Sequence, residues 1–99
     1  MKLFLISQDH NSEIVFLSYD SYDSAVVACD SALEAQEIHP DNHLKWDGTT
    51  WFIINNYGAK VVFDNDSSWC HPSHVKVRFI GTAEEGTKKG VILASYNAG

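Results

Sequence analysis

Basic residues are scarce in this chain of 99 residues and absent from most of its first half. Thirteen acidic residues oppose seven lysines and arginines, which gives a formal net charge of −6. No Lys or Arg lies between Leu3 and Leu44, where eight acidic residues fall. Proteins that bind nucleic acid need clustered bases to neutralise phosphates. The sequence therefore disfavours direct nucleic-acid binding, and the acidic half either attracts a basic partner or serves solubility alone.

Other absences narrow the class of protein further. No secretory signal follows Met1, and no apolar run approaches the roughly 20 residues that span a membrane. We therefore expect a cytoplasmic protein without membrane contact, in which the two cysteines stay reduced. Cys29 lies in an apolar run and is predicted to be buried. The six glycines are scattered and form no phosphate-binding loop, so no cofactor is predicted.

Hydrophobic residues make up 44% of the chain, enough for a packed core. Short apolar or alternating runs separated by turn residues are typical of β-strands. They occupy residues 2–7, 14–17, 25–29, 44–46, 51–54, 61–63, 74–80 and 91–96. We predict a single domain, residues 1–99, with an α+β fold: a mostly antiparallel sheet of about six strands with one short helix packed on it.

Local patterns place several elements. Residues 2–7 and 14–17 are predicted to pair as a hairpin. The run 25–29 is apolar on both faces, which indicates a central strand. Ser31 and Glu34 form a capping box at the start of the helix, and Pro40 ends it near residues 38–39. Ala35 and Ile38 are expected to face inward.

The middle of the chain predicts a three-stranded meander. Asp47-Gly48 is typical of a two-residue hairpin turn, and residues 56–59 form a second turn. A four-residue second turn puts Phe52, Ile54, Val61 and Phe63 on one face, and Leu44, Trp46, Trp51, Ile53 and Val62 on the other. Farther along, Val75, Val77 and Phe79 share a buried face, opposite Lys76 and Arg78. One short helix cannot cover so much apolar surface. We therefore expect a second sheet layer, a second copy of the chain or a partner to bury the rest.

Candidate chemistry centres on Cys70, His71 and His74. These side chains are of the types that bind zinc, and Cys29, His39 or His43 would be a fourth ligand. Their spacing matches no established zinc signature, so no metal site is predicted. Cys70 also lacks any sign of a third group to orient a histidine base. We therefore predict no catalytic residue and no enzyme.

A short repeat, Tyr19-Asp20-Ser21 followed by Tyr22-Asp23-Ser24, is better suited to binding a protein. Tyrosines offer large contact area at low entropic cost, and the carboxylates can pair with bases of a partner. In the alternative, the tyrosines lie on the sheet. The residues predicted to bind a partner are Tyr19, Asp20, Tyr22, Asp23, Asp30, Glu34 and Glu37. Trp46 and Trp51 belong either to the core or to an aromatic contact patch.

Residues 1–8, 22–28, 35–40 and 90–99 together resemble small proteins of phages and prophages. The resemblance covers about a third of the chain. It implies that the protein acts in a phage or prophage setting, but it identifies no catalytic or binding residues. Small acidic phage proteins of this size are often inhibitors of host defence. Anti-CRISPR proteins, many of which block the basic surface of a nucleoprotein complex, are an analogy of size, charge and setting.

These observations lead to one expectation and two alternatives. We expect an acidic interaction protein that inhibits a host defence effector, as anti-CRISPR proteins do, by binding its basic, nucleic-acid-binding surface. The first alternative is a small-ligand or metal-binding module. The second is a structural accessory protein that forms a homodimer.

Overall fold

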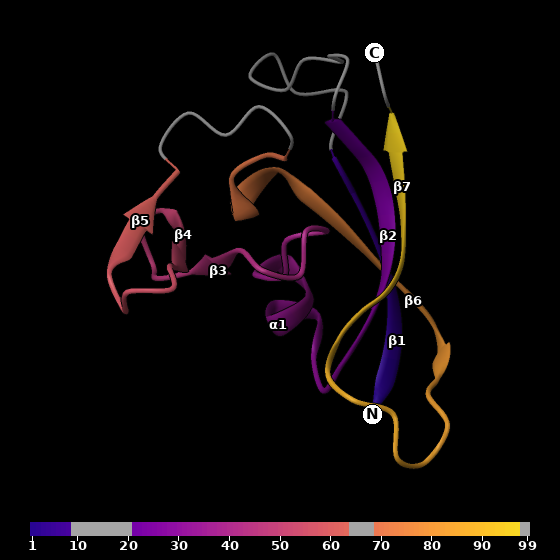
Figure 1. Cartoon of the computed structure of the whole chain (residues 1–99). Helices are drawn as coiled ribbons and strands as arrows, with labels where there is room; N and C mark the ends of the chain where they lie inside the picture. The colour runs from indigo at the N-terminus through magenta and orange to yellow at the C-terminus, as the bar shows by residue number, and fades with distance from the viewer. Residues whose placement is uncertain (9–20, 64–68, 98–99) are drawn as a thin grey trace.

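The structure is a computed structural model that describes residues 1–8, 21–63 and 69–97, and its fold is α+β (Figure 1). One antiparallel sheet has the order β6-β1-β2-β7 and a smaller one the order β3-β4-β5. The larger contains β1 (Lys2–Gln8), β2 (Ser21–Cys29), β6 (Val75–Thr82) and β7 (Gly90–Asn97). The smaller contains β3 (Lys45–Trp46), β4 (Trp51–Ile54) and β5 (Lys60–Val62). The helix α1 spans Ala32–Gln36, and a 3-10 turn spans Pro72–His74. The predicted fold class is confirmed, while the predicted hairpin strand at residues 14–17 lies outside the described residues.

The strand β2 occupies the predicted central position, between β1 and β7. Its residues Ala25, Val27 and Cys29 are buried on one face. The Cys29 thiol donates to the carbonyl oxygen of Ser31 at 3.3 Å, and burial raises the pKa of this thiol. Cys29 is therefore a small core residue, as predicted, held in its unreactive thiol form.

The helix α1 begins as the sequence predicts and ends earlier. The Ser31 hydroxyl oxygen accepts from the backbone N–H of Glu34 at 3.2 Å, which caps the first turn. The Glu34 carboxylate does not complete the capping box, because it pairs with Lys89. Ala35 is fully buried, and Ile38, just beyond the helix, packs against the core as expected.

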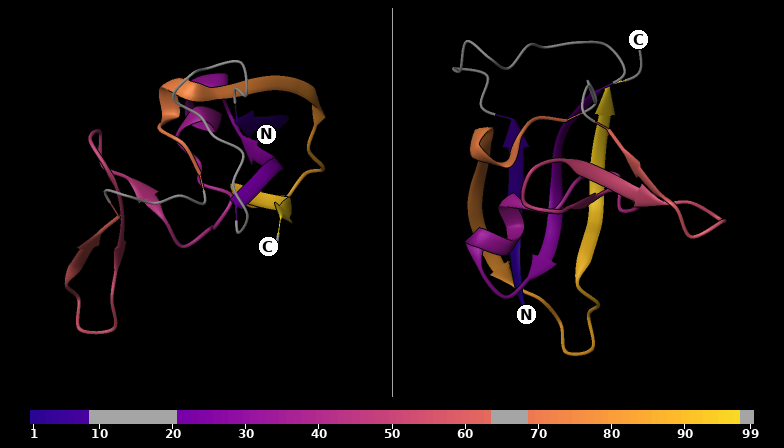
Figure 2. Two further views of the ribbon diagram at one scale, coloured as in Figure 1. Left: turned by 90° about the horizontal axis from the view of Figure 1, so that it is seen from above. Right: turned by 90° about the vertical axis from the view of Figure 1, so that its left-hand side faces the viewer.

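Both α1 and the β3-β4-β5 sheet lie on the same face of the larger sheet (Figures 1 and 2). The core forms between these two layers, and two connecting segments each add a buried residue, Leu44 and Trp69. Its buried members are Phe4, Ile6, Ala25, Val27, Cys29, Ala35, Leu44, Trp51, Trp69 and Val75. The other face of the larger sheet receives no described element.

The first turn of the meander differs from the prediction. Trp46 pairs with Trp51, so the loop contains the four residues between them and the expected two-residue turn is wrong. The carboxylate oxygen Oδ1 of Asp47 accepts from the backbone N–H groups of Thr49 and Thr50, each at 2.8 Å. This side chain satisfies the loop backbone locally and so widens the turn.

The second turn is longer than expected as well, by one residue. Ile54 pairs with Lys60, which leaves residues 55–59 in the loop. The side-chain oxygen of Asn55 accepts from the backbone N–H groups of Tyr57 and Ala59, at 2.9 and 3.0 Å. The predicted faces of β5 are therefore wrong, because a one-residue slip turns every side chain over. Val61 shares a face with Ile53, and Val62 with Phe52.

Asp47 also makes this small sheet sensitive to acid. Its oxygen Oδ2 lies 2.6 Å from Lys60 Nζ. This bond, helped by the two backbone donors, lowers the pKa of Asp47 from 3.8 to about 2. A carboxyl with a depressed pKa in the folded state contributes stability above its unfolded pKa, and the contribution is lost as the pH falls through the folded pKa.

We therefore expect Asp47→Asn to be less stable than the parent above about pH 4, with the difference shrinking as the pH falls to about 2. Urea unfolding at several pH values measures this difference. Glu85→Gln, which also removes one negative charge from an exposed position, is the control of equal charge change. A difference that stays constant across this pH range would show that the pKa of Asp47 is not depressed by folding.

Candidate functional site

The residues predicted to bind a partner fall in separate places. Tyr19 and Asp20 lie outside the described residues. Tyr22 is half-buried, and its ring centroid lies 6.0 Å from that of His39 and 4.9 Å from that of Tyr96. This position matches the alternative that the tyrosine lies on the sheet. Asp23 is exposed on β2, six residues or about 20 Å from the end of the strand that leads to α1.

Three of the predicted acidic residues do gather around α1. Asp30 precedes the helix, Glu34 lies in its first turn and Glu37 follows its last residue. Asp30 and Glu37 are exposed, and within the described part of the chain neither carboxylate forms an ion pair. We call Asp30, Glu34 and Glu37 the α1 acidic surface.

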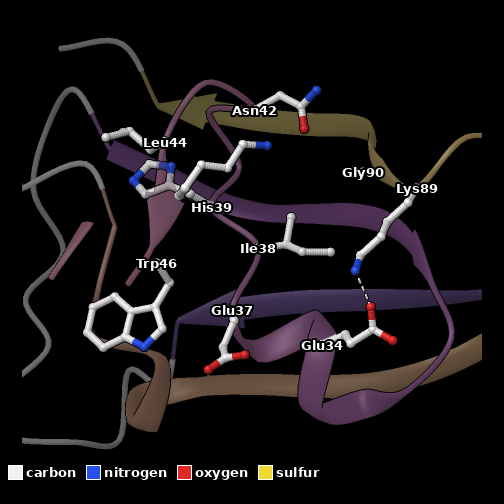
Figure 3. A pocket seen from close by; sticks show the side chains of 10 residues that line it. Glu34, Glu37, Ile38, His39, Asn42, Leu44, Trp46, Lys89 and Gly90 are labelled. Atoms are coloured by element: carbon white, nitrogen blue, oxygen red, sulfur yellow. Dashed lines mark ion pairs between the residues drawn. The ribbon is translucent and has the colours of Figure 1, made fainter. Parts of the chain in front are cut away.

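A pocket of about 430 Å³ opens beside this surface (Figure 3). Glu34, Glu37 and Ile38 line it from α1 and the residues that follow the helix. The other lining residues come from the loop 39–44, from β3, and from the turn before β7 together with the first residue of that strand: His39, Asn42, Leu44, Lys45, Trp46, Lys89 and Gly90. In the view of Figure 3, Glu37 lies between the Trp46 ring and the ion pair of Glu34 with Lys89. Acidic, basic and aromatic side chains therefore share one pocket.

His39 holds the wall of this pocket in place. Its side chain is 1% exposed, and its ring atom Nδ1 accepts from the backbone N–H of Asp41 at 2.9 Å. An imidazole that accepts at Nδ1 carries its proton on Nε2. The ring meets Trp51 edge to face, with centroids 5.0 Å apart. His39 thus ties the loop after α1 to the small sheet.

Asn42 fixes the opposite wall. Its side-chain oxygen accepts from the backbone N–H of Val91 at 3.4 Å. Gly90 precedes Val91 with φ +134°, and a Cβ atom at Gly90 would lie 3.0 Å from the same oxygen. The loop and the start of β7 approach so closely because Gly90 has no side chain. The sequence carries no signal of this contact, since the two segments are far apart in the chain.

The charges in the pocket are partly matched. The hydrogen bond from Lys89 to the Glu34 carboxylate raises the pKa of the lysine ammonium, so Lys89 keeps its positive charge at neutral pH. Glu37 and Lys45 form no ion pair with any described residue. With Asp30 nearby, the unmatched charge around α1 is predominantly negative.

The cysteine and histidine side chains after β5 do not form a metal centre in the described residues. No group of three or more His, Cys, Asp or Glu side chains in that part of the chain is placed to hold an ion. His71 instead caps the 3-10 turn, its Nδ1 accepting from the backbone N–H of Ser73 at 3.1 Å. The ring centroids of His71 and His74 are 6.4 Å apart. His71 therefore shapes the 3-10 turn, and its ring lies beside that of His74.

Comparison with known proteins finds no relative of this chain. The chain matches no protein-family model, and neither a curated protein nor a solved structure is significantly similar to it. Among the described residues, no helix has the length and apolar character needed to cross a membrane.

Proposed function

We propose that this protein is a non-enzymatic inhibitor that docks its α1 acidic surface on a basic surface of another protein. The partner is a nucleic-acid-binding effector of host defence in the cytoplasm of an infected cell, and docking blocks its nucleic-acid groove. The resemblance to small phage proteins supports this setting. The charge distribution supports the mode of binding, because an acidic surface is attracted to a groove that evolved to bind phosphates.

The observation that carries the proposal is the pair of unmatched carboxylates at Asp30 and Glu37. Glu34 already has Lys89 as its counterion, whereas the other two are exposed without one among the described residues. An arginine of the partner can take both oxygens of a carboxylate in a fork-shaped bond. Beside Glu37, the half-buried Trp46 offers a ring for the same guanidinium group.

A displacement assay tests the proposal. The probe is a nona-arginine peptide bound to a fluorescently labelled single-stranded oligonucleotide, and added protein releases the oligonucleotide by covering the arginines. We expect release by the parent protein, weakened by salt because exposed charges are screened within about 10 Å at 0.1 M. Asp30→Lys/Glu37→Lys should need about tenfold more protein, since each exposed pair contributes up to about 1 kcal/mol.

The matched control is Glu84→Lys/Glu85→Lys, in the turn between β6 and β7. Both double variants change the net charge from −6 to −2, because each reversal adds two charges. We expect the control to release the oligonucleotide almost as well as the parent. Equal losses in the two variants would mean that release follows net charge alone, and the α1 acidic surface would not be the binding site.

A further inference from the structure

All three tryptophans of the chain line one small pocket between the small sheet and residues 69–71. The pocket has a volume of about 140 Å³. Its aromatic lining residues are Trp46, Trp51, Phe63, Trp69 and His71. We call it the tryptophan pocket. Among the described residues, only Trp46 lines both this pocket and the one beside the α1 acidic surface, so the two are separate sites.

Two hydrogen bonds of Trp51 hold the pocket together. Its carbonyl oxygen accepts from the backbone N–H of Phe63 at 2.8 Å. Its indole Nε1 donates to the carbonyl oxygen of Cys70 at 3.3 Å. Trp51 and Trp69 are both buried and form the floor of the pocket, whereas Phe63 is exposed and forms a wall. The pocket is therefore part of the folded structure and open at its mouth.

The volume of the tryptophan pocket and the angles between its rings fit one flat six-membered ring. An apolar cavity of about 150 Å³ binds benzene, and this pocket is close to that volume. The Trp46 ring meets the Trp51 ring at 62° and the His71 ring at 81°. A flat ligand can therefore stack on one ring and meet another edge to face, which are the arrangements that aromatic rings prefer.

The polar groups of the pocket favour a ligand with hydrogen-bond acceptors. Trp69 Nε1 is buried and has no hydrogen-bond partner in the described part of the chain, although buried indole N–H groups usually have one. His71 Nδ1 accepts from the backbone N–H of Ser73 at 3.1 Å, so His71 Nε2 carries a proton and is a second donor. No Asp, Glu, Lys or Arg is among the described lining residues. These groups suit an uncharged ligand with acceptor oxygens and disfavour a cation.

We propose that the tryptophan pocket binds an uncharged planar ring that carries carbonyl oxygens, the chemistry of a free pyrimidine base. The ring stacks among the tryptophans, and a carbonyl oxygen accepts from Trp69 Nε1. A free base has no phosphate, so it needs no cluster of basic residues and is compatible with an acidic chain. This activity goes beyond the docking of the α1 acidic surface, because neither Asp30 nor Glu37 lines the pocket.

Titration with uracil, followed by tryptophan fluorescence, tests the site, since every tryptophan of the chain lines the pocket. N-acetyltryptophanamide under the same conditions corrects for collisional quenching. We expect saturation at about millimolar uracil, as for a ligand of this small size. Uridine monophosphate should bind more weakly than uracil, because its phosphate is repelled by a protein of net charge −6.

Two variants locate the binding. Trp69→Phe keeps a ring but removes the donor, so it should weaken uracil binding about fivefold, as the loss of one hydrogen bond does. It should not weaken the binding of benzene, which has no acceptor. Phe63→Leu removes a ring from the wall at an exposed position and should also weaken uracil binding. Phe79→Leu is the matched control, since Phe79 is exposed on β6 and does not line the pocket.

Several results would overturn the proposal: no saturation with uracil, saturation with tetramethylammonium chloride instead, tighter binding of uridine monophosphate than of uracil, or equal affinity of the parent and Trp69→Phe for uracil. If Trp69→Phe does not fold, equal affinities of Phe63→Leu and Phe79→Leu for uracil would overturn it as well. The displacement assay depends on Asp30 and Glu37, so it fails or succeeds independently of the uracil titration.

Discussion

Replacing Trp51 with alanine should lower the free energy of unfolding by about 3–5 kcal/mol, the largest loss expected of a single substitution in this chain. The Trp51 side chain is 4% exposed. Its ring packs against His39 and Trp46, with centroids 5.0 and 5.1 Å away. Its indole Nε1 donates to the carbonyl oxygen of Cys70 at 3.3 Å. Trp51 thus joins the small sheet to the loop after α1 and to the segment that leads into β6.

Urea unfolding followed by circular dichroism measures this loss. Trp51→Phe retains a ring but removes the indole donor, so we expect a smaller loss of about 1–3 kcal/mol. Tyr57→Ala is the control for removing an aromatic ring, because Tyr57 lies in the loop between β4 and β5 and is 95% exposed. It should change stability by no more than about 0.5 kcal/mol. If Trp51→Ala were as stable as Tyr57→Ala, the small sheet would not pack on the larger one.

A second large effect is expected at Gly90. Its φ of +134° is a backbone conformation that L side chains rarely adopt, and a Cβ atom there would press on Asn42. We expect Gly90→Ala to cost about 1–3 kcal/mol of unfolding free energy, because the backbone is strained and the bond from Val91 to Asn42 is disturbed. The same urea titration measures it.

Gly81→Ala provides the matched comparison. Gly81 also lies in a strand of the larger sheet, but it has no such backbone angle, and no atom lies within 4 Å of a Cβ atom placed there. This variant should keep its stability within about 0.5 kcal/mol of the parent. Similar losses at the two glycines would show that backbone conformation at the start of β7 carries no special cost.

The sequence predicts most strands of this fold but fails at its turns. Strands such as β2 and β7 are visible because apolar side chains dominate short runs bounded by turn residues. Asp47-Gly48 misleads because the Asp47 carboxylate satisfies two loop N–H groups and opens the turn to four residues. Asn55 does the same in the next turn. Side-chain hydrogen bonds of this kind depend on loop geometry that residue type alone does not specify.

The candidate site is less predictable than the fold. The scarcity of bases locates Asp30, Glu34 and Glu37 from the sequence, since charge can be read directly from residue types. The ion pair between Glu34 and Lys89 cannot be predicted from residue types, because it joins a helix to a turn much later in the chain. Asn42 and Gly90 meet only through the same tertiary contact. The position of Tyr22 could not be predicted either, because the repeat that contains it gives no indication that its ring lies against His39.

The pairing of β1 has a consequence for how the chain acquires its structure during synthesis. One neighbour of β1 is β2, but the other is β6, from the last quarter of the chain. The larger sheet is completed only by β7, the last strand in the described residues. Contacts between such distant segments slow folding, because long loops must close before the contacts form. The larger sheet and the core packed on it therefore form only after β6 and β7 have been synthesised.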